Sequence, residues 1–372
     1  MAWQGFFIPV APASPTMKRL FLLIFIVSAF VYTWKKLDEI PLLAIGQPSS
    51  TGTIQQKREA PFFNNLRAKT DIPFRVTYRP LESVGFKDTH QLQMLKEGTI
   101  DLASLRFMQN SEMEPSLQGI DLSGMITDYK SAQKVIAAYG GTVDHYLQAR
   151  FNAKLLGVWT FGPQEIFCNR PINKLTDIKG LKVRVASTAM GTFISELGAT
   201  PVVVSFDETK NALSLGLVDC AITSAASANF AGWPKYANYN FSIPVQFGLN
   251  GYAISLKKWN TLSYEQQGIL QKAFDSYLQE LWQFTKVLQT DAKACNTGAP
   301  CKFGTPYKVQ SSSPSPRDIQ LSHQIIMSKV LPEWGERCEK IHPGCRQTWQ
   351  EKLSPYIHNF EANDLKDNIP LQ

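Results

Sequence analysis

Short apolar stretches alternate with helical patterns in the first third of the chain. Residues 41–46, 73–81 and 99–108 predict three strands, and the segments between them predict helices that end near Lys69 and at Gly98. A strand–helix–strand order of this kind is typical of an α/β domain, in which ligand-binding groups lie at the carboxyl ends of the strands. One α/β unit is therefore expected here.

A second run of the same kind follows two short strands at 154–161 and 164–168. Residues 181–185 alternate between apolar and basic side chains, which predicts a half-buried strand. Two further helix–strand pairs come next, and Asp207 is the expected N-cap of the second of these helices. The pattern predicts a second α/β domain, and strands within 241–256 are expected to cross back to the first.

The clearest helical pattern begins at Ser263. Ser263 and Gln266 have the spacing of a capping box, and apolar residues then recur at helical spacing to about Ala294. We expect one long helix over 261–294.

An apolar run lies near the start of the chain. Residues 20–34 are apolar and are flanked on both sides by pairs of Lys and Arg. Their number suits a secretory signal and falls short of the roughly 20 residues that span a bilayer. The segment 1–36 is therefore expected to be an export signal, and translation of the natural protein is expected to start at Met17. No small-residue cleavage site follows, so an uncleaved membrane anchor is the alternative.

Composition narrows the class of protein. The chain has 372 residues, of which 44% are hydrophobic and 19% charged, so it has room for two packed domains and is neither disordered nor a coiled coil. Removing the four cations of residues 1–36 lowers the formal net charge from +7 to +3. No long Lys/Arg run remains, and nucleic acid is not an expected partner.

Export would place the six cysteines in an oxidising compartment, where disulfides form. Two pairs bracket short loops that contain Gly and Pro, and local disulfides are expected there. These pairs are Cys295–Cys301 and Cys338–Cys345. Cys168 and Cys220 form the third pair or remain two buried thiols. A zinc site that includes His342 is disfavoured, since the chain has no CxxC pair.

Motifs of catalysis are missing from the sequence. It has no G-x-S-x-G elbow, no H-E-x-x-H, no phosphate-binding Gly-rich loop and no dinucleotide fingerprint, so we expect neither an enzyme nor a cofactor. A cleft between two α/β lobes is instead a natural site for a small molecule. Arg184, on the strand at 181–185, then faces either solvent or the anionic group of a ligand.

Two blocks of sequence resemble a known family. NRPINKLTDIKGLKVRVAS (169–187) and LGATPVVVSFDETKNALSLGLVDCAIT (197–223) are similar to signature blocks of the DctP-like solute-binding proteins of tripartite ATP-independent periplasmic (TRAP) transporters. LKEGTIDLA (95–103) and WNTLSYEQQGILQKAF (259–274) resemble a strand entry and the long helix of that family. The resemblance covers residues 40–292 and does not extend to the C-terminal part of the chain.

The resemblance implies a two-lobed α/β periplasmic binding protein, type II-like, with crossing strands and a long helix that spans both lobes. The expected parts are lobe I at 37–160, completed by about 250–372, lobe II at 161–249, the long helix at 261–294, and a cysteine-containing extension at 295–372 packed on the lobes.

The implied function is that of a monomeric periplasmic receptor. It would bind an organic acid between the lobes and deliver it to the small and large membrane subunits of a TRAP permease for secondary active uptake. Arg184 falls on the family arginine that pairs with the ligand carboxylate, and a planar guanidinium can donate two parallel hydrogen bonds to such a group. Gln164 stands where many relatives place a second arginine, which favours a monocarboxylate, with an aromatic or amide-bearing substituent as an option.

Six further side chains are candidates for the wall of this site, and each also has a purely structural explanation. They are Thr223, Ser187, Phe206, Gln47, Arg106 and Trp233. The structural alternatives are a plain strand threonine, strand-end packing, a turn before Pro48, an ion pair at the surface or between the lobes, and a core tryptophan.

Two other functions stay open at this point. A periplasmic hydrolase or lyase on the same scaffold would need Cys168 or Cys220 as its reactive group. A membrane-tethered sensor would keep residues 20–34 and present the two lobes to a signalling partner.

Overall fold

The computed structural model describes residues 39–85 and 87–357. The expected export signal at 1–36 lies outside the described residues. Within the described part, no helix has both the length and the apolar character needed to cross a membrane.

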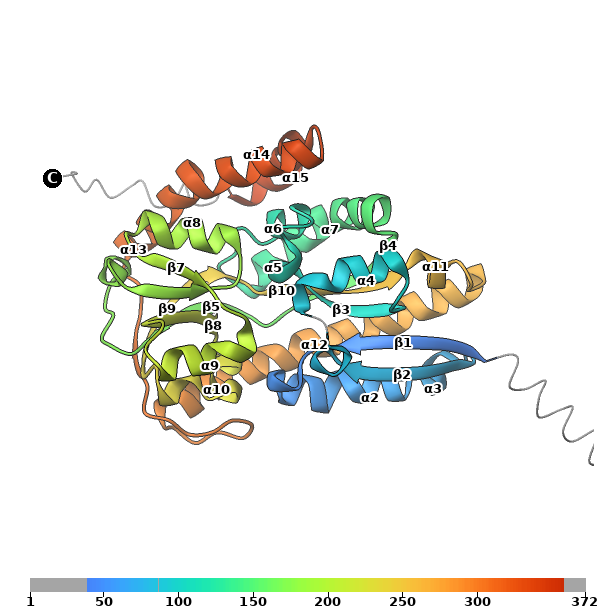
Figure 1. Cartoon of the computed structure of the whole chain (residues 1–372), viewed down its shortest axis with the longest axis horizontal. Helices are drawn as coiled ribbons and strands as arrows, with labels where there is room; N and C mark the ends of the chain where they lie inside the picture. Colours follow the sequence, from blue (N-terminus) through green and yellow to red (C-terminus); the bar gives the residue numbers. More distant parts are fainter. Residues whose placement is uncertain (1–38, 86, 358–372) are drawn as a thin grey trace, which may run out of the picture.

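Two sheets form the framework of the molecule (Figure 1). The first, in the order β2-β1-β3-β10-β4, is the basis of lobe I. Its strands are β1 (Ile40–Gly46), β2 (Phe74–Pro80), β3 (Leu102–Arg106), β4 (Ala153–Thr160) and β10 (Leu249–Ser255). β1 is parallel to β2 and β3, whereas β10 is antiparallel to β3 and β4. Every residue of β3 and β10 is buried, because helices cover both faces of the sheet there.

The second sheet, in the order β11-β9-β5-β8-β6-β7, is the basis of lobe II. Its strands are β5 (Gln164–Cys168), β6 (Lys182–Val185), β7 (Thr200–Val203), β8 (Cys220–Ser224), β9 (Tyr239–Gln246) and β11 (Gln310–Ser312). β6 is parallel to both β7 and β8, so the carboxyl ends of these three strands share one edge of the sheet.

Short helices pack around each sheet. Lobe I has α2 (Ala60–Asn64), α3 (Leu66–Thr70), α4 (Gln91–Glu97), α5 (Phe107–Asn110), α6 (Ser116–Gly119), α7 (Tyr129–Phe151) and α11 (Leu256–Trp259). Lobe II has α8 (Thr188–Glu196), α9 (Phe206–Ser214) and α10 (Ala225–Ala231).

The sequence predicted Asp207 as the N-cap of α9, and the structure shows that this prediction is wrong. Ser205 caps this helix by accepting from the backbone N–H of Glu208, because Ser205 and Glu208 have the spacing of a capping box.

Two chain crossings join the lobes, one from β4 to β5 and the other from β9 to β10. The expected return to the first domain within 241–256 is therefore confirmed. The buried carboxylate of Asp121 accepts hydrogen bonds from the backbone N–H groups of Phe247 and Leu249, at 2.9 and 3.0 Å. Between them, Gly248 has a φ of +63°, and a Cβ there would lie 2.4 Å from the side chain of Gln164. The crossing thus needs a glycine.

The long helix α12 (Tyr264–Thr297) runs across both lobes (orange in Figure 1). Its predicted capping box, Ser263 with Gln266, is present. Trp282 of α12 donates to a carbonyl of β4 in lobe I, and Asn296 donates to the carbonyl of Ala225 in lobe II. One rigid element is therefore hydrogen-bonded to both halves.

The C-terminal helices are α13 (Pro316–Ile325), α14 (Leu331–Ile341) and α15 (Cys345–Ile357). α13 lies beside α8 of lobe II, and α14 and α15 lie along the side opposite α12 (red in Figure 1). In lobe I, the indole N–H of Trp334 donates to the carbonyl of Pro115 at 2.8 Å. In lobe II, Thr192 of α8 donates to the carboxylate of Glu333 at 2.7 Å. These helices thus contact both lobes.

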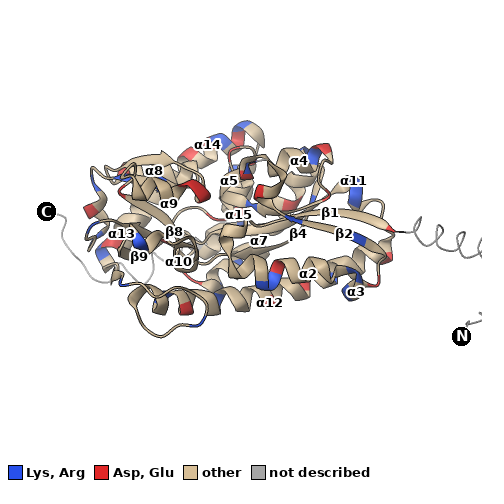
Figure 2. Cartoon of the chain, turned by 60° about the horizontal axis from the view of Figure 1, so that its bottom comes forward, with Lys and Arg blue, Asp and Glu red and all other residues tan. Residues whose placement is uncertain are grey.

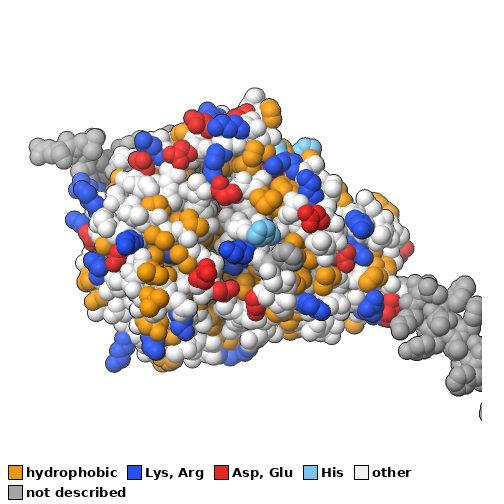
Figure 3. Space-filling view, in the orientation of Figure 1, with side chains coloured by type: hydrophobic (Ala, Val, Ile, Leu, Met, Phe, Trp, Pro, Cys, Tyr) orange, Lys and Arg blue, Asp and Glu red, His pale blue; other side chains and the backbone are white. Residues whose placement is uncertain are grey.

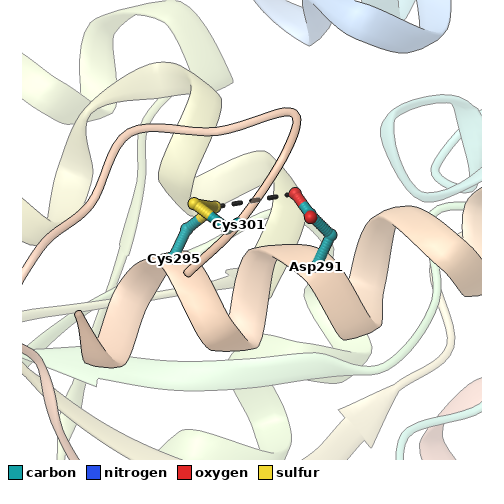
Figure 4. A group of neighbouring side chains, drawn as sticks. All are labelled: Asp291, Cys295 and Cys301. Carbon is teal, nitrogen blue, oxygen red and sulfur yellow. Dashed lines mark hydrogen bonds between the residues drawn. A yellow bond between two sulfur atoms is a disulfide. The ribbon is translucent and has the colours of Figure 1, made fainter. Parts of the chain in front are cut away.

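All six cysteines are described and paired, as Cys168–Cys220, Cys295–Cys301 and Cys338–Cys345. The two local disulfides that the sequence predicted are confirmed, and of the two alternatives for Cys168 and Cys220 the structure has the disulfide. Asp291 of α12 lies beside the second disulfide (Figure 4) and accepts backbone hydrogen bonds from Lys302 and Phe303, which holds the closed loop on the helix. Asp291, Cys295 and Cys301 are close enough to surround a metal ion, but both sulfurs are in the disulfide and so are not thiolate ligands.

Lys, Arg, Asp and Glu side chains are interspersed along the elements and on the face shown in space-filling form (Figures 2 and 3). This mixed distribution differs from the single basic stripe that follows a nucleic-acid backbone.

Candidate functional site

A small cavity, partly open to solvent, lies between the two lobes. Arg106 and Met108 line it from lobe I, where β3 meets α5. Gln164, Arg184 and Thr223 line it from the strands of lobe II. Arg106 is the last residue of β3 and Arg184 lies within β6. Regular strands, and not flexible loops, therefore position both arginines.

Arg184 is held rigidly on β6. Its Nε donates to the carbonyl of Val204 at 2.9 Å and its Nη1 to that of Ile222 at 3.1 Å, while its guanidinium lies 5.7 Å from the ring of Trp233. Only 3% of the residue is exposed. Within residues 39–85 and 87–357, no group accepts a hydrogen bond from Nη2, which is therefore free to bind a ligand at the cavity.

Burial is the main cause of an unusually low pKa for this arginine. Desolvation, with the positive charge of Arg106 as a second cause, lowers the pKa of Arg184 from 12.5 to about 9. Arg184 is still protonated at neutral pH. Among the described residues no carboxylate pairs with this buried cation, which makes the cavity favourable for an anion.

Arg106, at the carboxyl end of β3, is the second cation of the cavity. Its Nη1 lies 3.0 Å from Oδ2 of Asp88, and the two side chains are 7% and 14% exposed. Its Nε is buried without an acceptor in the described structure, and its guanidinium lies 5.8 Å from the ring of Phe206 across the lobe boundary. Arg106 therefore lines the cavity and also forms an ion pair, but this pair is buried within lobe I rather than at the surface or between the lobes as the structural alternative had it.

Neutral polar and aromatic groups complete the wall from lobe II. Gln164 begins β5 and donates to the carbonyl of Gly162 at 2.7 Å. Thr223 lies on the neighbouring strand β8, and Phe206 is the first residue of α9 rather than the end of a strand. All three line the cavity, as the sequence analysis anticipated, although their contacts with a ligand remain a prediction.

Three other candidates lie away from the cavity wall. Ser187 is the N-cap of α8 and accepts from the backbone N–H of Met190. Gln47 is fully buried and donates to the hydroxyl of Ser104, so it belongs to a polar network inside lobe I. Trp233 is fully buried beneath Arg184 and supports the site from behind. Of the structural alternatives, the core tryptophan describes Trp233, whereas Ser187 is a helix cap rather than strand-end packing and Gln47 belongs to a buried network rather than to a turn.

Sequence reasoning missed several groups at the site. Met108 and Gln109 lie two and three residues after Arg106, Ala186 follows β6, and Asp88 pairs with Arg106. The first three lie just beyond strand carboxyl ends, which is a signal that could have indicated them. Asp88 had no such signal, because it lies in a short 3-10 helix (Asp88–His90), 18 residues away from its partner.

Comparison with known proteins assigns the chain to a family. The model of the bacterial extracellular solute-binding proteins, family 7 (DctP), matches residues 45–303, which is more than half of the chain. The chain belongs to this family. The resemblance to TRAP solute-binding proteins is thereby confirmed, and the family is one of receptors rather than of enzymes.

Curated relatives of this family-7 protein are about a quarter identical to it over the residues that align. The sialic acid-binding periplasmic protein SiaP of Vibrio cholerae is 26% identical over 179 residues, 48% of this chain and 56% of the relative. The match thus spans little more than half of that protein's length. The C4-dicarboxylate-binding periplasmic protein DctP of Vibrio cholerae is 23% identical over 287 residues, 76% of this chain and 75% of the relative.

Solved structures confirm the two-lobed fold. DctP7 of Bordetella pertussis, a receptor that binds pyroglutamic acid, superposes with a TM-score of 0.74 at 15% identity over 85% of this chain and 99% of that one. A TRAP protein of Desulfovibrio salexigens with bound orotic acid gives a TM-score of 0.75 at 16% identity over 85% and 99%.

The hydrolase or lyase alternative loses its reactive group. It required a free thiol at Cys168 or Cys220, and these two residues form a disulfide. Sulfurs in a disulfide are not nucleophilic thiolates, so the family assignment and the cysteine chemistry agree.

Proposed function

We propose that this protein is a periplasmic receptor that binds an organic acid by its carboxylate in the cavity between the lobes. The observation that carries the proposal is Arg184, a buried guanidinium fixed by two backbone carbonyls, with a free Nη2 at the cavity. In a closed and dry site, a charge-assisted hydrogen bond to this group would be strong. Arg106, Gln164, Thr223 and Phe206 would contact the rest of the ligand.

Ligand capture would work by closure of the lobes. Ser50 of lobe I donates to Asp207 of lobe II at 2.5 Å, and Thr188 of lobe II donates to Glu112 of lobe I. A ligand that touches both lobes favours this closed arrangement by its higher affinity for it. The chain crossings beside Asp121 would form the hinge.

Delivery would involve the membrane subunits of a TRAP permease. Proteins of this family bind small organic acids and work with permease components. We propose that this receptor acts as a monomer that releases its acid to the permease for secondary active uptake. Whether the export signal is cleaved or tethers the receptor to the membrane can be read from the mass of the mature N-terminal peptide.

The proposal can be tested by thermal-shift screening against organic acids, with the Arg184→Ala variant alongside. Arg170→Ala is a matched control, since Arg170 is an arginine of the same lobe with an exposed side chain that pairs with Asp219. We expect the native protein and the control to respond to the same acid, and Arg184→Ala to lose about 2–5 kcal/mol of binding free energy. If no carboxylate stabilises the native protein, or if Arg184→Ala responds equally, the proposal is wrong.

A further inference from the structure

The charges around the cavity do not balance. Among the described residues that line it, Arg106 and Arg184 are the charged ones, and both are positive. Asp88 lies behind Arg106 and pairs with it at 3.0 Å, outside the lining itself. With two cations and one paired carboxylate, the cavity and its immediate support carry a net charge of +1 before a ligand enters.

Asp88 is held in place by a buried side chain. Its carbonyl accepts a hydrogen bond at 2.8 Å from the side chain of Asn110, which is itself fully buried. Gln91, also fully buried, accepts from the backbone N–H of Arg106 at 3.0 Å and so fixes the other partner of the pair. The Arg106–Asp88 pair is therefore a built feature of lobe I rather than a chance contact at the rim.

This arrangement has a consequence for ligand charge. A ligand with one carboxylate would neutralise the cavity through Arg184. A ligand with two carboxylates would leave one of them uncompensated, because Asp88 already neutralises Arg106 and the other polar lining groups, such as Gln109 and Gln164, are uncharged. An unpaired buried charge is costly, so the second carboxylate should weaken binding.

We propose that Asp88 makes this receptor selective for organic monoanions over dicarboxylates by neutralising Arg106 from behind the cavity wall. The inference rests on the proposed function, because it assumes that a carboxylate binds at Arg184. The residue that sets the selectivity, Asp88, lies outside the cavity lining and pairs with Arg106, one of the two arginines of the cavity.

Pairs of ligands that differ only in charge separate the effect of ligand charge on binding from the effect of ligand shape. Each dicarboxylate is compared with its own monoamide, which keeps the skeleton and replaces one carboxylate with a neutral amide: succinate with succinamate, glutarate with glutaramate, and phthalate with phthalamate. The quantity measured by calorimetry is the ratio of the two dissociation constants within a pair. A whole-protein charge effect is controlled by Asp275→Asn, which removes an exposed carboxylate on α12.

Three variants make the test specific. Asp88→Asn raises the net charge of the site to +2, Asp88→Glu keeps it at +1, and the double variant Asp88→Asn/Arg106→Gln returns it to +1. We expect the native protein to prefer the monoamide at least tenfold, and Asp88→Asn to shift the ratio at least tenfold towards the diacid. Asp88→Glu, the double variant and Asp275→Asn should keep the native preference. The melting temperature of each variant shows that it is folded.

The outcomes distinguish this inference from the proposed function. If the native protein binds monoamides but Asp88→Asn leaves the ratio within twofold, the role of Asp88 is wrong while the carboxylate receptor stands. The same conclusion follows if the native protein binds a diacid as tightly as its monoamide. If no acid of the panel binds, the proposed function fails and the role of Asp88 fails with it.

Discussion

Replacing Arg184 by methionine should make the ligand-free protein more stable while it abolishes binding. Arg184 is buried and has no carboxylate partner in the described structure, so its charge opposes folding until a ligand anion arrives. Methionine has a similar length and no charge, and replacement of a buried charge by a packed apolar group is often stabilising. The buried charge of Arg184 would then destabilise the ligand-free receptor, and its presence would be explained by ligand binding.

The magnitude follows from the pKa of Arg184, which burial and Arg106 lower from 12.5 to about 9. Since one pKa unit corresponds to about 1.4 kcal/mol, the folded state disfavours the charged side chain by about 5 kcal/mol at neutral pH. Methionine leaves the carbonyls of Val204 and Ile222 without this donor, which costs about 1–1.5 kcal/mol each. We expect a net stabilisation of about 2 kcal/mol.

The assay is urea unfolding at pH 7 followed by circular dichroism. The native protein and the variant are first unfolded in guanidinium, dialysed and refolded, because a retained ligand would stabilise the native protein by mass action. Arg170→Met, which replaces an arginine whose side chain is 53% exposed, should change the free energy of unfolding by less than about 0.5 kcal/mol. If Arg184→Met unfolds more easily than the native protein, the argument from its buried charge is refuted.

Three further predictions concern stability. Burial raises the pKa of Asp121 from 3.8 to about 6, so its contribution to stability is present below pH 4 and is lost as the pH rises through 6. The native-minus-Asp121→Asn difference in unfolding free energy should therefore fall by about 3 kcal/mol over this range, and a flat difference would contradict the assignment. Replacing Cys168 and Cys220 by alanine opens a loop of 52 residues and should cost about 4 kcal/mol in urea unfolding; a cost below about 1 kcal/mol would exclude this loop effect. Trp334→Phe removes the hydrogen bond to Pro115 and should cost about 1–3 kcal/mol in the same assay, whereas an unchanged midpoint would mean that this bond is not stabilising.

Local patterns were sufficient to predict most of the fold. Ser263 and Gln266 marked the start of α12 because a capping box is a short-range signal, and the crossing of β9 to β10 followed from two adjacent strand patterns. The N-cap of α9 was misplaced because Asp207 and Ser205 are both good capping residues two positions apart. Only the actual hydrogen bond to Glu208 decides between them.

The candidate site was predictable where it depends on strand position, and less so where it depends on distant contacts. Arg184 and Thr223 lie on strands, and the strand pairing brings both to one cavity. Gln47 follows a strand in the same way, yet its backbone N–H donates to the buried carboxylate of Glu59 and its Nε2 to the hydroxyl of Ser104, both inside lobe I. No local pattern reveals such a network, since its members are far apart in sequence.

The most direct test of the central claim is a crystal structure of the receptor with the acid that gives the largest thermal shift. We expect a carboxylate oxygen of this acid about 2.7–2.9 Å from Nη2 of Arg184, with the acid enclosed by both lobes. An acid bound in the cavity with its carboxylate directed away from Arg184, or bound outside the cavity altogether, would contradict the account.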